Sequence, residues 1–163
     1  RANGDILVFL NDDTEPHDWW LEPLVAGLGP DSDIGITGAK LIYPDGDIQH
    51  AGVYFDAPDG ILTAHNVTED EPTRDVDAVT GACLAITRSL FNDCTGFDPA
   101  FRNGYEDVDL CLRVKAGGWR VRYIRESVVT HLESQSGPRR WAHVGENIQR
   151  LQDLWAVRAE SVE

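Results

Sequence analysis

The chain opens with an apolar run that leads directly into polar residues. Residues 6–10 are all apolar, and Asn11-Asp12-Asp13 follows at once. A continuous run rich in β-branched and aromatic residues is typical of a strand buried on both faces in a parallel sheet. Ligands of open α/β sheets bind beyond the carboxyl ends of strands, so these oxygen-bearing side chains suit Mg²⁺ or Mn²⁺. The same residues would also suit a turn or a cap before a helix opened by Pro16.

Periodic apolar positions predict the other elements. Helical spacing favours helices over residues 17–28, 89–93, 106–116 and 141–157. Strand-like runs cover residues 34–39, 40–43, 48–55, 77–87, 119–124 and 127–132. Asp45-Gly46 predicts a hairpin, and residues 56–75 predict a loop with at most a short strand near Ile61-Leu62. This order predicts an α/β fold with a mixed, mostly parallel sheet, flanking helices and a β-hairpin insertion.

Length and charge narrow the class of protein. The 163 residues suffice for one domain with its own core, and no apolar stretch approaches membrane-spanning length. A formal net charge of −14 repels nucleic acid and anionic lipid, so we expect neither as a direct partner. The three cysteines have no metal-binding spacing, which favours a reducing compartment. The chain contains no Met, and we interpret it as a piece of a longer protein.

Three groups of polar residues are candidates for metal binding or catalysis. Asn11-Asp12-Asp13 ends one predicted strand, Glu106-Asp107 begins a predicted helix, and His131 ends another predicted strand. If the three groups converge, Asp13 and His131 could share one metal ion, with Asp107 opposite them as a base.

Each group also has a purely structural interpretation. Glu106, Asp107 and Asp109 could simply satisfy the amino end of the helix, with Asp109 paired to Arg113 four residues later. A single His at the end of a strand is more often a hydrogen-bonding residue than a metal ligand. Spacing alone leaves both interpretations open.

An ordered set of motifs along nearly the whole chain resembles family 2 glycosyltransferases with the GT-A fold. Each motif alone is weak, but the order is specific. The motifs are Gly4–Thr14, Gly38–Leu41, Gln49–Gly52, Thr80–Cys83, Gly96–Asp98, Tyr105–Arg113 and His131–Ser134. The resemblance implies that residues 1–163 form the C-terminal, metal and acceptor side of a GT-A domain whose N-terminal, nucleotide-binding part is absent.

The resemblance also implies a role for each candidate residue. Asn11-Asp12-Asp13 occupies the position of the family's DxD motif, with Asn11 in place of the first Asp. It implies metal binding by Asp13 and His131, and catalysis by Asp107 as the base. The remaining residues are implied to lie near the donor (Asn11, Asp12, Gly81) and the acceptor (Glu106). His50 also recurs in the pattern, but no mechanism follows for it, and a hydrogen-bonding residue of the hairpin is an equally good interpretation.

The implied reaction is transfer of a sugar from a nucleotide-diphosphate sugar to an acceptor hydroxyl. The leaving diphosphate gathers negative charge, and so acidic a chain needs a divalent cation, Mn²⁺ or Mg²⁺, to stabilise it. A hydroxyl attacks well only when a base takes its proton. One carboxylate opposite the leaving group suffices for a single, inverting displacement, and no second carboxylate is demanded as a nucleophile. Arg139 and Arg140 could close over the diphosphate.

The resemblance further implies partners and a location. The acceptor is expected to be a glycan or a lipid-linked sugar of a surface polysaccharide, and the location cytoplasmic or peripheral at the inner membrane face. Strand 6–10 would lack its neighbour, so we expect its open edge to self-associate or to pair with another chain. The piece alone is expected to be inactive.

Three other functions remain open from the sequence. A non-catalytic sugar-binding domain would bind ligand without needing Asp107. A structural domain with Ca²⁺ at Asn11-Asp12-Asp13 would be stabilised by Ca²⁺ and indifferent to nucleotides. A nucleotidyltransferase on a similar sheet would release pyrophosphate rather than a nucleoside diphosphate.

Overall fold

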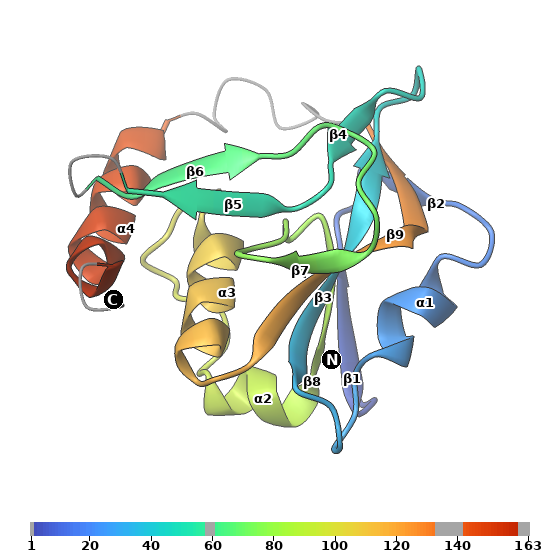
Figure 1. Ribbon diagram of the computed structural model, residues 1–163, viewed down its shortest axis with the longest axis horizontal. Coiled ribbons are helices and arrows are strands. Elements are labelled where there is room, and N and C mark those ends of the chain that lie inside the picture. The colour runs from blue at the N-terminus through green and yellow to red at the C-terminus, as the bar shows by residue number, and fades with distance from the viewer. Residues whose placement is uncertain (1, 58–60, 133–141, 160–163) are drawn as a thin grey trace.

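The computed structural model describes residues 2–57, 61–132 and 142–159 (Figure 1). Arg139 and Arg140 lie outside the described residues. The strands are β1 (Ile6–Leu10), β2 (Thr14–Pro16), β3 (Ile34–Ile42), β4 (Ile48–His50), β5 (Val53–Asp56), β6 (Thr63–Asn66), β7 (Arg74–Val76), β8 (Cys83–Thr87) and β9 (Arg120–His131). The helices are α1 (Leu21–Ala26), α2 (Arg88–Asp93), α3 (Glu106–Ala116) and α4 (Val144–Ala159).

The main sheet has the strand order β1-β8-β3-β9-β2, with β4 attached to β3 and β7 attached to β9. The prediction of a mostly parallel sheet is wrong, because β3 with β9 is the only parallel pair among the described residues. β8 lies between β1 and β3 and runs against both, so β1, β3 and β9 share one direction although β1 and β3 never pair. Their carboxyl ends therefore meet at one edge of the sheet.

β1 is an edge strand, not the doubly buried parallel strand that its apolar run predicts. It pairs antiparallel with β8, and no other strand of the described chain pairs with it. Leu7 and Phe9 pack against one hydrophobic cluster, while Ile6 and Val8 pack against the other. Both faces of β1 thus contact the core, but its open edge leaves these side chains half-buried and Leu10 41% exposed.

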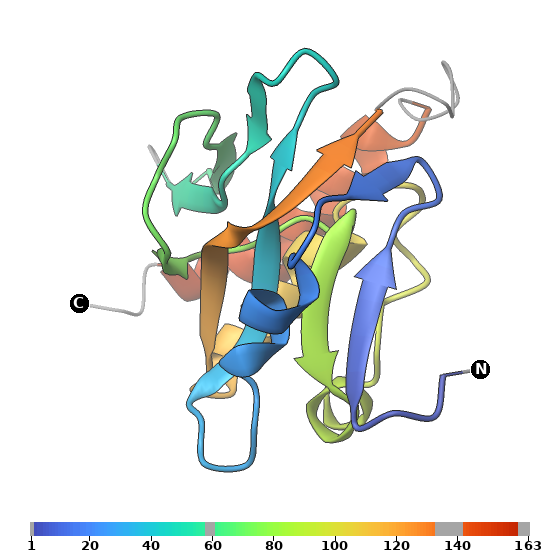
Figure 2. The same ribbon diagram turned by 90° about the vertical axis from the view of Figure 1, so that its right-hand side faces the viewer.

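Two hydrophobic clusters cover the two faces of the sheet. The cluster on one face includes Leu24 of α1, and the cluster on the other includes Leu110 and Val114 of α3. Figure 2 shows α1 in front of the sheet and α3 and α4 behind it. The result is a sheet between helical layers, which exposes its polar strand ends at one edge.

Several predicted boundaries shift for identifiable reasons. Residues 34–42 form one strand where two were predicted, and residues 120–131 form another. The predicted strand 48–55 divides into β4 and β5 at Gly52, whose φ of +100° suits glycine. β3 and β4 pair antiparallel across the turn at Asp45-Gly46. The predicted loop 56–75 contributes β6 and β7.

Two helices begin later than predicted, α1 and α4, whereas α3 has the predicted bounds. α1 covers only residues 21–26 of the predicted 17–28, because β2 precedes it and Trp19 has a φ of +64°. α3 begins at Glu106 and ends before Gly117, as predicted. α4 begins at Val144. Among the described residues, no helix combines the length and the apolar character that crossing a membrane requires.

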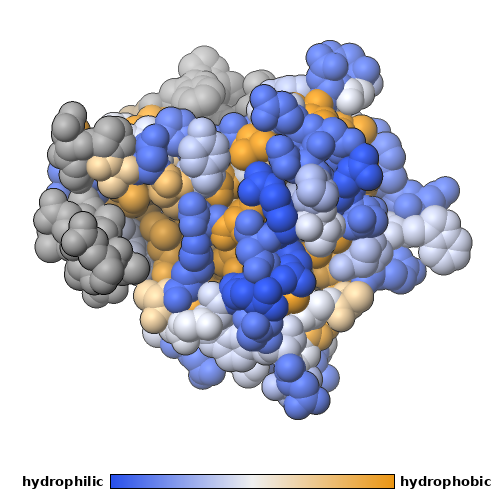
Figure 3. All heavy atoms as spheres, in the orientation of Figure 1, coloured by the Kyte–Doolittle hydropathy of each residue, from blue (hydrophilic) through white to orange (hydrophobic). Residues whose placement is uncertain are grey.

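The face formed by β7 and β9 carries ion pairs. Arg122 lies 2.7 Å from Asp75, and Arg125 pairs with Asp70. Figure 3 shows hydrophilic residues as a band across this face, beside an area of hydrophobic ones. Exposed ion pairs of this kind contribute little to stability, and no site residue lies among them.

Candidate active site

A polar cavity of about 600 Å³ opens where β1 and β9 end. Its walls come from four segments that are far apart in the sequence. All seven residues that the sequence singled out line it: Asn11, Asp12, Asp13, Gly81, Glu106, Asp107 and His131. The common direction of β1 and β9 explains the convergence, since it brings both carboxyl ends to one edge of the sheet.

Asp13 and His131 face each other across neighbouring strands. β2 pairs antiparallel with the end of β9, with Thr14 opposite His131. The backbone N–H of Leu132 also donates to the carbonyl of Asp13 at 2.9 Å. The Nε2 atom of His131 lies 3.1 Å from Oδ1 of Asp13, and both side chains are largely buried. The pair is therefore held from the backbone.

The geometry of this pair suits a cation. Nδ1 of His131 lies 2.6 Å from the side-chain oxygen of Gln49, which can only accept, so we assign the proton to Nδ1. In the neutral ring, the lone pair on Nε2 then faces the Asp13 carboxylate, and a divalent ion could satisfy both acceptors. No group of three or more His, Cys, Asp or Glu side chains in the described part of the chain forms a complete metal site. If Asp13 and His131 held such an ion, its other positions would be open to phosphate oxygens and water.

Asp107 lies in the first turn of α3, and both its carboxylate oxygens are occupied. Oδ2 accepts the backbone N–H of Gly81 at 2.6 Å, and Oδ1 accepts that of Val108 at 2.8 Å. Burial raises the pKa of Asp107, and the neighbouring Glu106 charge adds to the rise, while these hydrogen bonds oppose it. A carboxylate with a raised pKa is a better proton acceptor than an exposed one.

Gly81 allows the close approach of Asp107. A Cβ atom at this position would lie 3.3 Å from the Cβ of Asp107 and 3.4 Å from its Oδ2. These contacts are tight enough that Asp107 would have to shift. Gly81 lines the polar cavity, and its N–H also holds the carboxylate.

Asn11 and Asp12 lie in a turn and also line the polar cavity. The Thr14 hydroxyl donates to the carbonyl of Asn11 at 2.6 Å, so the segment is a turn. The N–H of Asn11 donates to the carbonyl of Ala82 at 3.0 Å, which ties the turn to the Thr80–Ala82 segment. Both side chains are exposed and line the polar cavity.

The segment before α3 has an unusual backbone. Asn103, Gly104 and Tyr105 all have positive φ, at 53°, 139° and 72°. Such conformations are costly for residues other than glycine and persist only where surrounding contacts hold them. Oε2 of Glu106 accepts the N–H of Gly104 at 2.8 Å, so Glu106 supports the loop besides lining the cavity.

Asn147 of α4 also holds this loop, and the sequence analysis missed it. Its Nδ2 donates to the carbonyls of Arg102 and Gly104, both at 2.9 Å, and its Oδ1 accepts the N–H of Arg102 at 3.2 Å. Asn147 is 2% exposed. A polar residue on a predicted amphipathic helix was the one available signal, and it is a weak one.

Asp109 has the structural role that spacing suggested. Its Oδ2 accepts a hydrogen bond from Nε of Arg113 at 2.8 Å, and its Oδ1 accepts one from Nε1 of Trp155 at 3.0 Å. Asp109 is buried and does not line the polar cavity. The helix therefore carries one carboxylate for packing, Asp109, and two that line the cavity, Glu106 and Asp107.

Comparison with known proteins identifies the family. A family profile described as "Glycosyltransferase like family 2" matches residues 1–150. The chain belongs to this family. An O-antigen biosynthesis protein, RfbC of Myxococcus xanthus, is 37% identical over 149 residues, covering 83% of this chain and 12% of that protein. The pre-mycofactocin glycosyltransferase of Mycobacterium tuberculosis is 28% identical over 127 residues, covering 78% of this chain and 27% of that protein.

The fold agrees with the family. A crystal structure of GalNAc-T7 with UDP, GalNAc and Mn²⁺ superimposes with a TM-score of 0.61 at 21% identity, covering 78% of this chain and 27% of that chain. At this identity the likeness shows a shared mixed α/β fold with flanking helices, as in GT-A glycosyltransferases. The chain spans less than a third of the length of these relatives.

Proposed function

We propose that the chain supplies the metal and acceptor side of an inverting, metal-dependent glycosyltransferase. The observation that carries this proposal is the meeting of the Asp13–His131 pair and Asp107 in one cavity. Membership of the family supports sugar transfer. The inverting course and the divalent ion, Mn²⁺ or Mg²⁺, are part of the proposal.

In this proposal the chain's own residues divide the work between the two sides of the cavity. Asp13 and His131 hold the ion, which neutralises the charge of the departing nucleoside diphosphate when bound. Asn11, Asp12 and Gly81 line the donor side, and Asp107 takes the proton of the acceptor hydroxyl as it attacks. One base opposite the leaving group accounts for a single displacement with inversion.

The position of Asp107 favours its role as the base. Asp107 and His131 also line a second cavity of about 360 Å³ beside the first. A residue on the wall between two cavities can contact an acceptor on one side and the reacting sugar on the other. Its two backbone hydrogen bonds keep the carboxylate in one orientation.

We propose a glycan or lipid-linked acceptor of a surface polysaccharide, with Glu106 on the acceptor side. A relative is named as an O-antigen biosynthesis protein, which supports this class. Nucleotide sugars are the expected donors, and we propose cytoplasmic action, peripheral to the inner membrane face.

We also propose that the nucleotide-binding part belongs to the rest of the full-length protein and lies beside the open edge of β1. The chain alone would then be inactive and would self-associate through residues 6–10. Light scattering of residues 1–163 tests this: a stable, unassociated monomer would contradict it.

The first experiment is calorimetric titration of the full-length protein with a panel of nucleotide sugars, with and without Mn²⁺. We expect one donor to bind only in the presence of Mn²⁺, and we expect this binding to be lost in Asp13→Ala. Asp31→Ala is the matched control, because Asp31 is exposed and precedes β3 at the opposite end of the sheet.

Other outcomes would identify the rival functions. Tight Ca²⁺ binding without nucleotide binding would favour a structural domain. Sugar binding that survives Asp107→Asn without any turnover in the wild type would favour a binding domain. Release of pyrophosphate would identify a nucleotidyltransferase.

A further inference from the structure

Two adjacent residues of β4, Gln49 and His50, are buried beside the candidate site, at 8% and 4% exposure. β4 is a short strand that pairs with β3 after the hairpin. Burying two neighbouring polar side chains is costly unless each makes hydrogen bonds. Because successive side chains of a strand point to opposite sides, the two residues reach different partners.

Gln49 holds His131 at two points. The Gln49 side-chain oxygen lies 2.6 Å from Nδ1 of the imidazole, and its Nε2 donates to the His131 carbonyl at 3.3 Å. This double contact fixes both the ring orientation and the tautomer, leaving Nε2 directed at Asp13. Partners of this kind behind a metal-binding His raise metal affinity.

His50 holds the other half of the site. Nδ2 of Asn66 donates to the Gln49 carbonyl at 2.8 Å, which turns the Asn66 oxygen toward His50. That oxygen lies 2.6 Å from Nδ1 of His50, so we assign the His50 proton to Nδ1. The unprotonated Nε2 then accepts the backbone N–H of Thr80, 3.3 Å away.

The hydrogen bond to Thr80 acts on Asp107 through the backbone of this one residue. The N–H of Gly81, which follows Thr80 directly, donates to Oδ2 of Asp107. Holding the Thr80 backbone therefore holds the donor that orients the carboxylate. Burial lowers the pKa of His50 to about 4, so at neutral pH the ring is uncharged and its Nε2 remains an acceptor.

We infer that Gln49 and His50 are positioning residues with separate duties: Gln49 fixes His131 for the metal ion, and His50 fixes the Thr80–Gly81 backbone for the base Asp107. The inference deepens the proposed function and rests on it. It assigns a part in the reaction to His50, for which the sequence offered only the interpretation of a hydrogen-bonding hairpin residue.

The metal half is tested in the full-length protein with Mn²⁺ alone, by measuring free Mn²⁺ with electron paramagnetic resonance. Gln49→Met removes both hydrogen bonds at similar size, and we expect roughly 10- to 100-fold weaker binding. Gln49→Glu keeps an acceptor for Nδ1 and should restore most of the affinity. His50→Leu should leave Mn²⁺ affinity within about twofold, because His50 does not contact the metal ligands. Equal losses of Mn²⁺ affinity in Gln49→Met and His50→Leu would overturn the assignment of separate roles.

The base half is tested by turnover at saturating Mn²⁺ and donor. We expect His50→Leu to lower kcat by roughly 10- to 100-fold with KM for the donor unchanged, since a misplaced base slows the chemical step. His50→Gln, whose side-chain oxygen can accept from Thr80, should recover most of the rate. Normal kcat in His50→Leu, or no recovery in His50→Gln, would overturn the assignment.

A spectroscopic measurement tests the His50 assignment without a variant and without an activity assay. In ¹⁵N NMR of the labelled full-length protein, His50 should show a protonated Nδ1 and an unprotonated Nε2 at pH 7. The opposite tautomer would overturn the His50 assignment. If no donor is turned over, the proposed function fails, whereas the tautomer and the Mn²⁺ affinities still decide where Gln49 and His50 act.

Discussion

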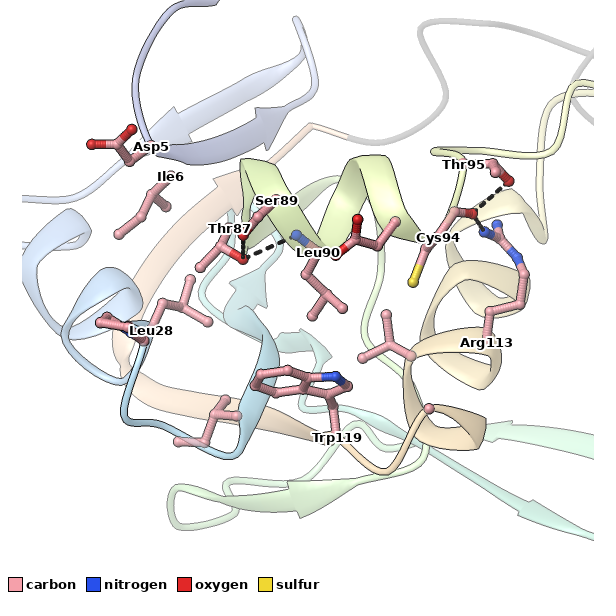
Figure 4. A pocket seen from close by; sticks show the side chains of 16 residues that line it. Asp5, Ile6, Leu28, Thr87, Ser89, Leu90, Cys94, Thr95, Arg113 and Trp119 are labelled. Atoms are coloured by element: carbon pink, nitrogen blue, oxygen red, sulfur yellow. Dashed lines mark hydrogen bonds between the residues drawn. The ribbon is translucent and has the colours of Figure 1, made fainter.

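Two cavities among the described residues differ in what their polar groups do. The larger, about 790 Å³, lies among the start of β1, the end of α1, and helices α2 and α3. Figure 4 shows Ile6, Leu28, Leu90 and Trp119 around this apolar cavity. The polar cavity is smaller, about 600 Å³, and holds every predicted site residue. The larger of these two cavities is therefore not the one that the predicted site residues line.

Polar atoms of the apolar cavity serve local structure. The Thr87 hydroxyl caps α2 by accepting the N–H of Leu90 at 3.4 Å, and Arg113 donates to the carbonyl of Cys94 (Figure 4). In the polar cavity, by contrast, the side chains of Asp13 and His131 lie 3.1 Å apart, and Asp107, whose pKa burial raises, lines the same cavity. Titratable side chains that gather in one cleft, one of them with a raised pKa, are typical of a ligand-binding site.

Asp107→Asn should break the polar cavity's function most severely. We expect kcat to fall by roughly 10²- to 10⁴-fold, because the amide cannot take a proton, with Mn²⁺ affinity unchanged. Steady-state kinetics and Mn²⁺ titration of the full-length protein measure this. Asp93→Asn, at the rim of the apolar cavity, is the control, and an equal loss there would refute the contrast.

Leu90→Ala should act on stability instead. Leu90 is 9% exposed and lines the apolar cavity, so its truncation should cost about 2–5 kcal/mol of unfolding free energy. Thermal unfolding measures the loss, and kcat per folded molecule at 25 °C should remain at the wild-type value. A specific loss of kcat without destabilisation would mean that the apolar cavity has a catalytic role.

The pH dependence of turnover should report the desolvation of Asp107. The base works only when ionised, so kcat/KM should fall as pH drops through its pKa. Because burial raises that pKa, the acid limb should lie at higher pH than for an exposed Asp. A pH–rate profile with an acid limb at the ordinary value for Asp would contradict the assignment.

Gly81→Ala should have a smaller effect on the same residue. The added Cβ would lie 3.3 Å from the Cβ of Asp107, which must then move by a few tenths of an ångström. We expect kcat to fall roughly tenfold with Mn²⁺ affinity retained. Gly145→Ala is the control, because a Cβ there meets nothing within 4 Å.

Ser89→Ala should have the smallest effect on stability and turnover. Ser89 is exposed at the apolar cavity, and its hydroxyl lies 3.3 Å from that of Thr87. We expect unfolding free energy within about 0.5 kcal/mol of wild type and unchanged kcat. A larger change in either quantity would indicate that the polar rim of the apolar cavity does more than cap α2.

Local patterns determined much of this protein. The acids and bases of residues 106–116, followed by Gly117-Gly118, specify α3, because capping and charge near helix ends act within a few residues. The apolar run 6–10 specifies β1, and the polar cluster after it specifies a turn at the strand's end. Motif order brought all seven cavity residues to notice before any of them could be seen together.

Only the tertiary structure decided which strands are neighbours. An apolar run has the same appearance beside a parallel or an antiparallel partner, so the insertion of β8 between β1 and β3 could not be deduced from it. The same holds for Gln49 beside His131, 82 residues apart, and for Asn147 beside Gly104, 43 residues apart. Local sequence sets the conformation of each segment, but a hydrogen bond between distant residues exists only after the whole sheet and its helices have packed.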